Sequence, residues 1–408
     1  MTIKNLLLLT VLLVSIHIAV AQKTTYYGEV ESIINTNCAS CHKPNGYGPF
    51  SLTNYSEVKS KGSFIAHVVE TKYMPPWKAD RDFRSFKNER GLTDEEINTL
   101  KQWLADGMPK GKRKGKPTPI PDNLENRKPD LVLEMIAPYE LSNESIEDYR
   151  FFNIPSHLKK DTYIESIAFI AGNKRQVHHS RVMIDTTNII RGINGLSEFD
   201  PKALAFQKNP LADEFLYGWV PGNLPVLYPP KTGKKIYANS DFILNIHYAP
   251  SSIKQEDLSK IELYFAKEKV EHEIKTLAIT EKDISNKPFY IKANRKPIFY
   301  VSYVIKEEMN LVSVLPHMHY LGKSFKARAI TPDGKEIPLI KIDDWDFNWQ
   351  TSYLYKEPVL LPKGTRILSE ATYDNTQENP RNPNSPAKDV GLGWNSTDEM
   401  MNLIFYYY

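Results

Sequence analysis

Hydrophobic and polar positions follow a helical period near the start of the chain. The segment TDEEINTLKQWLADG has apolar residues on one helix face, a capping box before them and a glycine after them, formed by Thr93, Glu96, Ile97, Leu100, Trp103, Leu104 and Gly107. A second helix is predicted from Ser63 to the prolines at 75 and 76. Residues 22–108 are therefore expected to form a small all-α domain.

From residue 130 onward the pattern changes to short alternating runs that are separated by Pro, Gly, Asn and Asp. DFILNIHYAP is one such run, and KSFKARAITPDGKEIPLIKI contains Asp333-Gly334 as a hairpin turn. Residues 130–408 are too many for one small sandwich. We therefore expect a multidomain fold, in which the helical domain is followed by two all-β, jelly-roll-like sandwiches at 130–287 and 288–408.

Residues 109–129 are basic and rich in proline, which predicts an extended linker. A nucleic-acid-binding tail is the competing interpretation, but the whole chain carries 52 basic against 49 acidic side chains. This balance argues against nucleic acid as a partner.

The first 21 residues, MTIKNLLLLTVLLVSIHIAVA, combine an early lysine, a short apolar run and an Ala-x-Ala end. They are typical of a cleaved signal peptide, and an uncleaved anchor is the alternative. No later segment is apolar enough to span a membrane, so we expect an exported protein, periplasmic or extracellular.

The only two cysteines, Cys38 and Cys41, lie in the C-x-x-C-H sequence that ends in His42. This arrangement predicts a covalently bound haem c with His42 as an axial ligand, and a dithiol redox pair is the competing interpretation. Met74, in KYMPPWKAD, is the candidate for the second axial position, and Met108 is its rival. With these ligands the segment resembles the class I cytochromes c, which implies electron transfer.

Five of the other histidines fall into three segments. The apolar alternation before His317 and His319 predicts a strand, in which residues i and i+2 share a face and could bind one metal. His178 and His179 are adjacent, so they can serve one metal only where the strand is bulged or ends. His247 stands alone in an apolar strand. Spacing alone leaves copper and zinc equally open.

Three more histidines have no such neighbours and are expected to be ordinary surface or hydrogen-bonded residues, namely His67, His157 and His272.

Four segments together resemble the copper type II ascorbate-dependent monooxygenases, the family of peptidylglycine alpha-hydroxylating monooxygenase and dopamine beta-monooxygenase. They are VHHSRVMID, NIHYAP, HMHYLGKSF and STDEMMNLIFYYY. The resemblance implies two copper ions: an electron-transfer copper on His178, His179 and His247, and a catalytic copper on His317, His319 and Met400. Met401 is the neighbouring alternative, and the match to Asp-Glu-Met favours Met400.

The resemblance further implies that O2 is used to hydroxylate a C–H bond of a small-molecule substrate. In the animal enzymes ascorbate supplies the electrons. Here the fused cytochrome is expected to relay them, from ascorbate or from a redox protein.

The sequence also departs from the family. Leu315 and Ile404 replace an Arg and a Tyr of the peptide-hydroxylating enzyme, although Asn402 is retained, and no disulfide is available outside the haem motif. These replacements argue for a more apolar substrate. Two alternatives stay open: a non-catalytic periplasmic protein that transfers electrons or binds metal, and a zinc-stabilised scaffold.

Overall fold

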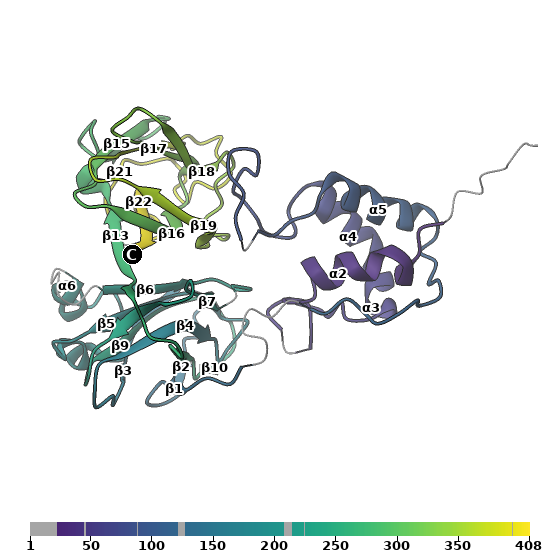
Figure 1. Cartoon of the computed structure of the whole chain (residues 1–408), viewed down its shortest axis with the longest axis horizontal. Coiled ribbons are helices and arrows are strands. Elements are labelled where there is room, and N and C mark those ends of the chain that lie inside the picture. Colours follow the sequence, from purple (N-terminus) through teal and green to yellow (C-terminus); the bar gives the residue numbers. More distant parts are fainter. Residues whose placement is uncertain are drawn as a thin grey trace, which may run out of the picture.

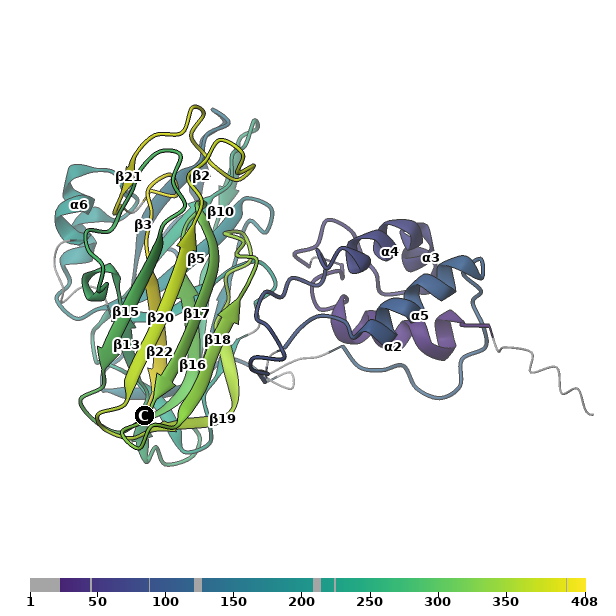
Figure 2. The same cartoon turned by 90° about the horizontal axis from the view of Figure 1, so that it is seen from above.

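A computed structural model of the chain describes residues 23–44, 46–87, 89–120, 127–207, 214–223, 225–393 and 395–408. The predicted signal peptide therefore lies outside the described residues. Within them, no helix has both the length and the apolar character to cross a membrane. Two β units lie one above the other, and a helical domain extends to one side of both (Figures 1 and 2).

The helical domain packs around a small apolar core that includes Tyr26, Ile34, Leu100 and Trp103. In the last helix, Thr93 and Glu96 form the predicted capping box through N–H···O contacts of 3.2 and 2.8 Å. The elements are η1 (Tyr26–Val30), α2 (Glu31–Asn37), α3 (Tyr55–Ser60), α4 (Gly62–Glu70) and α5 (Asp94–Ala105).

The predicted linker is not free over its whole length. Its beginning runs back along η1 and α2, where the N–H of Tyr26 donates to Pro109 O at 3.0 Å and the Asn35 amide donates to Thr118 O at 2.8 Å. Arg113 also pairs with Glu31 at 2.6 Å. These contacts make residues 109–118 part of the helical domain.

A second connection leaves the helical domain between α4 and α5. Residues 77–90 form an arm whose Ala79 and Phe86 are buried in the core of the second sandwich. Both residues make single antiparallel bridges there, Ala79 with Ile342 and Phe86 with Tyr355. The helical domain is therefore held to the β units by this arm as well as by the chain that follows α5.

The first β unit is a sandwich of two sheets, with Phe152, Val182 and Leu244 of one sheet packed against Ile164 and Ile261 of the other. One sheet has the order β3-β9-β5-β6 and the other β1-β11-β4-β8-β12, with β7 on β4. Their bounds are β1 (Leu131–Glu134), β3 (Asp148–Pro155), β4 (Thr162–Ile170), β5 (Val177–Asp185), β6 (Glu214–Trp219), β7 (Val226–Leu227), β8 (Thr232–Ile236), β9 (Asp241–Tyr248), β11 (Lys260–Phe265) and β12 (His272–Glu273).

Shorter elements decorate this unit: the strand pair β2 (Tyr139–Leu141) and β10 (Gln255–Asp257), the 3-10 turn η2 (Ile189–Ile193) and the helix α6 (Pro201–Gln207).

The second β unit is also a two-sheet sandwich, with orders β13-β22-β16-β19 and β15-β20-β17-β18. The predicted hairpin joins β17 to β18, and Gly334 has φ +87° in its turn. The elements are β13 (Lys275–Ile279), η4 (Glu281–Asp283), β14 (Tyr290–Ile291), β15 (Ile298–Val304), β16 (Met309–His317), β17 (Gly322–Ile330), β18 (Glu336–Ile342), β19 (Tyr353–Leu361), β20 (Arg366–Tyr373), β21 (Val390–Gly391) and β22 (Asn402–Tyr407).

The predicted fold class is confirmed, with a small helical domain followed by two β-sandwiches. Ile274 lies in the core of the first sandwich, whereas Ile279 lies in the core of the second. The change of core thus precedes the predicted boundary at 287/288, because β13 pairs with the C-terminal strand β22.

Candidate metal centres and haem site

The first candidate metal centre lies where β5 begins, beside the end of β9. His179 pairs with His247 across the two strands, and the register shifts between Val177 and His179. This irregularity is the bulge that the adjacent histidines required. It turns His178 toward the same side of the sheet as His179, so that three imidazoles converge.

The Nδ1 atoms of the three rings face one another. They form a triangle with edges of 3.2 Å from His178 to His247, 3.4 Å from His179 to His178 and 3.2 Å from His247 to His179. A point equidistant from the three nitrogens lies about 1.9 Å from each (roughly the edge divided by √3), close to the 2.0–2.1 Å length of a metal–imidazole bond. The cluster therefore fits a metal ion in its centre.

The surroundings keep these imidazoles neutral, as metal ligands must be. Burial lowers the pKa of His247 to about 3 and that of His179 well below its usual value. The ring of Tyr149 stacks on His247 with centroids 4.0 Å apart and an interplanar angle of 4°. This stacking holds the His247 ring, whose Nε2 lies 3.7 Å from the Glu147 carboxylate.

The second candidate centre lies at the end of β16. The strand ends at His317, so His319 follows in the next turn rather than on the strand face that the alternation predicted. The two rings nevertheless meet, with centroids 5.1 Å apart. Burial lowers the pKa of His317 to about 4 and that of His319 to about 3, so both are neutral at pH 7.

Hydrogen bonds select the same ring nitrogen in both residues. His317 Nδ1 donates to Gln350 Oε1 at 2.5 Å, and His319 Nδ1 donates to Asp398 O at 3.1 Å. Because each Nδ1 then carries the proton, each Nε2 keeps a free lone pair for a metal. The two clusters thus present opposite imidazole nitrogens.

A buried carboxylate links the backbone of Met400 to that of His319. Glu399 is 0% exposed, and its Oε2 accepts from the backbone N–H of His319 at 2.9 Å and of Met400 at 3.1 Å. Its Oε1 accepts from Leu321 N at 2.6 Å. The same side chain therefore ties the turn after β16 to the segment before β22, while Met401 packs in the apolar core of the sandwich.

The C-x-x-C-H segment follows α2, and its residues fit a haem. His42 Nδ1 donates to Phe50 O at 3.0 Å, which leaves Nε2 available as an axial ligand. A side chain at residue 48 would come within 2.5 Å of His42 Nδ1, so this close approach requires Gly48. Cys38 and Cys41 are free thiols, and burial raises the pKa of Cys38 to about 12, which is unlike the activated thiol of a dithiol redox pair.

The two candidate methionines lie at opposite ends of α4. The N–H of Met74 donates to Val68 O at 3.0 Å, and the side chains of both methionines pack against the same core as Cys38. Any side chain at residue 62 would come within 2.3 Å of Met108 Sδ, so the sulfur of Met108 lies against Gly62. The choice of Met74 as axial ligand stays a prediction.

Sequence reasoning missed several side chains that shape these centres: Glu399, Tyr149, Phe347, Asn348 and Gln350. Only Glu399 had a signal, since it stands inside the Asp-Glu-Met match beside Met400. The other four lie on strands or loops far from the histidines in sequence.

Fold and site together define a redox protein, in which a haem-type helical domain is joined to a β-sandwich pair with two histidine clusters. Residues 29–107 match the family model for cytochrome c. Residues 298–408 match the model for the C-terminal domain of copper type II ascorbate-dependent monooxygenases. The chain thus carries a C-terminal domain of this monooxygenase family behind a cytochrome c domain, and the predicted fusion is confirmed.

Proteins of this monooxygenase family bind copper, and cytochrome c domains bind haem. A monooxygenase uses O2, a substrate and a reductant. No curated protein matches the chain.

Similar solved structures include one of allantoicase, with 8% identity, 58% of this chain and 81% of that chain covered, and a TM-score of 0.18. Another is a two-domain protein of unknown function from Bacteroides fragilis, with 10% identity and a TM-score of 0.17. The match covers 67% of this chain and 94% of that chain. These likenesses are too weak to bear on fold or function.

Proposed function

We propose that the chain is an exported haem- and dicopper-containing monooxygenase that hydroxylates a C–H bond of a small substrate with O2. The observation that carries the proposal is the presence of two separate histidine clusters with unlike donors, one of them within the matched monooxygenase domain. A simple metal store would need only one kind of site.

The first copper would be held by Nδ1 of His178, His179 and His247, and the second by Nε2 of His317 and His319 with the sulfur of Met400. Bound copper supplies one-electron redox chemistry, and a thioether ligand favours its reduced form. Burial lowers the pKa of all five imidazoles, which keeps them neutral, and Gln350 and Asp398 orient the second pair.

Haem c would be attached to Cys38 and Cys41, with His42 and Met74 as axial ligands. Contacts between this segment and the first sandwich support electron relay. A side chain at Gly222, in the loop after β6, would come within 2.6 Å of Cys41 Sγ. Arg90 of the arm donates to Gly222 O.

An aromatic contact leads from the haem segment toward the first cluster. The ring centroids of Tyr47 and Trp219 lie 5.2 Å apart. Trp219 in turn pairs across the sheet with Ser180, the neighbour of His179. Packed side chains and one strand pairing thus connect the C-x-x-C-H loop to the His178, His179 and His247 cluster. This continuity supports the first cluster as the one that receives electrons from the cytochrome.

The side chains beside His317 support an apolar substrate. Leu315 is two residues before His317 on β16, so both side chains share a face. Leu315 and Ile404 are cross-strand partners, as are His317 and Asn402. Two aliphatic side chains therefore border the second cluster. The peptide-hydroxylating enzyme has at these positions an Arg, which binds the substrate carboxylate, and a Tyr hydroxyl.

The test is metal analysis and oxygen reactivity of the purified full-length protein. We expect two coppers and one haem per chain, and oxidation of both metals when the reduced protein meets O2. Zinc as the metal found in the β units would favour the scaffold instead. Copper that is bound but never changes its EPR signal would favour a non-catalytic metal-binding protein.

A further inference from the structure

One loop of the second sandwich reaches both histidine clusters. This segment, residues 344–350, joins β18 to β19 and is called the bridging loop here. Asn348 Oδ1 accepts from His178 Nε2 at 3.1 Å, in the first sandwich. Two residues later, Gln350 Oε1 accepts from His317 Nδ1 in the second cluster. In each cluster, therefore, the ring nitrogen of one imidazole that points away from the proposed metal donates to an amide of this loop.

The loop holds both amides in a defined orientation. Asn348 Nδ2 donates to Asp346 Oδ1 at 3.2 Å, and Gln350 Nε2 donates to Phe347 O at 2.8 Å. Since each amide nitrogen is engaged within the loop, each amide oxygen faces a histidine N–H. These contacts fix opposite tautomers, which leave Nδ1 of His178 and Nε2 of His317 as the lone-pair nitrogens.

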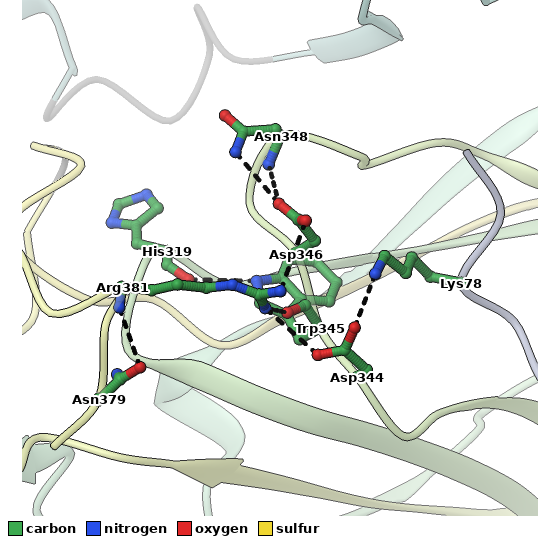
Figure 3. A network of polar contacts seen from close by, with 8 residues as sticks. All are labelled: Lys78, His319, Asp344, Trp345, Asp346, Asn348, Asn379 and Arg381. Carbon is green, nitrogen blue, oxygen red and sulfur yellow. Dashed lines mark hydrogen bonds and ion pairs between the residues drawn. The ribbon is translucent and has the colours of Figure 1, made fainter. Parts of the chain in front are cut away.

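Further contacts brace the bridging loop (Figure 3). Trp345 Nε1 donates to His319 O at 3.1 Å, and the Arg381 guanidinium forms an ion pair with Asp346 Oδ2 at 3.6 Å. The arm from the helical domain also joins, because Lys78 pairs with Asp344 at 2.8 Å. The loop is thus connected to the second cluster, to the cytochrome arm and, through Asn348, to the first cluster.

The ring of Phe347 lies close to imidazoles of both clusters. Its centroid lies 6.3 Å from that of His178, 6.0 Å from that of His179 and 5.7 Å from that of His319. A shift of the bridging loop would therefore disturb ligands of both clusters at once.

We propose that the bridging loop makes metal binding at the two clusters cooperative, with Asn348 and Gln350 as its positioning residues. A metal at one cluster fixes one imidazole and hence the loop amide that contacts it. The loop is then already ordered when the other cluster binds its metal, so the second binding step costs less conformational entropy. The inference rests on the proposed function only in requiring that both clusters bind copper.

The experiment measures Cu(I) affinity of the haem-loaded full chain without oxygen, by competition with a chromophoric chelator. Removing the group that accepts a hydrogen bond from a metal-bound histidine typically lowers the metal affinity about 10–100-fold. For Asn348→Ala we expect a loss of this size at the first cluster and a further loss of about fivefold or more at the second cluster, which Asn348 does not touch.

A second variant isolates the coupling. In His247→Ala the first cluster lacks one nitrogen, while the bridging loop keeps its contacts. In this background Asn348→Ala should no longer weaken the second cluster, because there is no metal at the first cluster to couple to. Gln350→Glu keeps an oxygen that can accept from His317 Nδ1 and should restore most of the affinity that Gln350→Ala loses.

Thr351→Ala is the matched control, since this neighbouring hydroxyl contacts Asn223 Oδ1 at 3.0 Å and neither histidine cluster. Thermal unfolding of the metal-free variants excludes misfolding as the cause. Equal second-cluster affinity whether the first cluster is filled or empty would overturn the cooperative role. If the wild-type chain binds no copper at either cluster, the proposed function fails and this inference fails with it.

Discussion

The carboxylate of Glu399 offers the sharpest test of how the second cluster is assembled. It is fully buried and accepts three backbone N–H groups, from His319, Leu321 and Met400. Two of these residues are proposed copper ligands, so one side chain sets the spacing between them. Changing it should affect the second cluster before it affects the first.

The expected magnitude follows from counting acceptors. In Glu399→Gln the amide oxygen can serve His319 and Met400, but the NH2 group then faces the Leu321 N–H, and a buried donor without an acceptor costs about 1–3 kcal/mol. Burial raises the pKa of Glu399 to about 8, so at pH 7 this side chain is mostly uncharged and the neutral Gln changes the local charge little. We expect a net loss of about 1–2 kcal/mol for Gln. Glu399→Leu leaves all three donors unpaired, and at about 1–3 kcal/mol for each donor we expect a loss of at least about 3 kcal/mol.

The assay combines denaturant unfolding with site-resolved copper binding. Copper affinity of the second cluster should fall in the order wild type, Glu399→Gln, Glu399→Leu, while the first cluster keeps its affinity. Asp185→Asn is the control, because Asp185 is also 0% exposed and accepts from Thr187 N at 2.7 Å and Ile190 N at 3.1 Å at the far end of β5. Equal loss of second-cluster copper in Asp185→Asn and Glu399→Gln would refute the reasoning.

Three further predictions follow from the same geometry. Met400→Ala should lower turnover and second-cluster copper, with first-cluster copper retained by EPR; unchanged turnover would exclude the sulfur as a ligand. His42→Ala should abolish turnover driven by a carrier protein but not by excess ascorbate, and equal loss of both would make the haem structural. The pKa of Asp80 is lowered, chiefly by the hydrogen bond that it accepts from Lys341 at 2.8 Å. This pair therefore stabilises the arm fully at pH values above the ordinary pKa of Asp. The stabilisation is lost as the pH falls through the lowered pKa of the folded state. Lys341→Met should therefore cost about 0.5–1 kcal/mol at pH 7, and this difference in unfolding free energy should vanish in acid; a pH-independent difference would contradict the assignment.

Short-range patterns were sufficient for much of the fold and for the identity of the candidate ligands. The capping box at Thr93 and Glu96 forms as predicted, because its hydrogen bonds lie within one helical turn. The hairpin at Gly334 likewise needs only local backbone geometry. The condition set for His178 and His179, a bulged strand, is met by the register shift beside them.

The sequence by itself therefore determined the kinds of domain and the candidate donor residues, since C-x-x-C-H, His-x-His and His-His are local and chemically specific. Only the tertiary structure decided how these donors meet. His247 reaches His178 through the register of β9 on β5, and Glu399 joins Met400 to His319 across a sandwich. The positions of the bridging loop and of the arm around Phe86 depend on packing between residues far apart in the chain. The shape of the whole core decides such contacts, and no local spacing of residues encodes that shape.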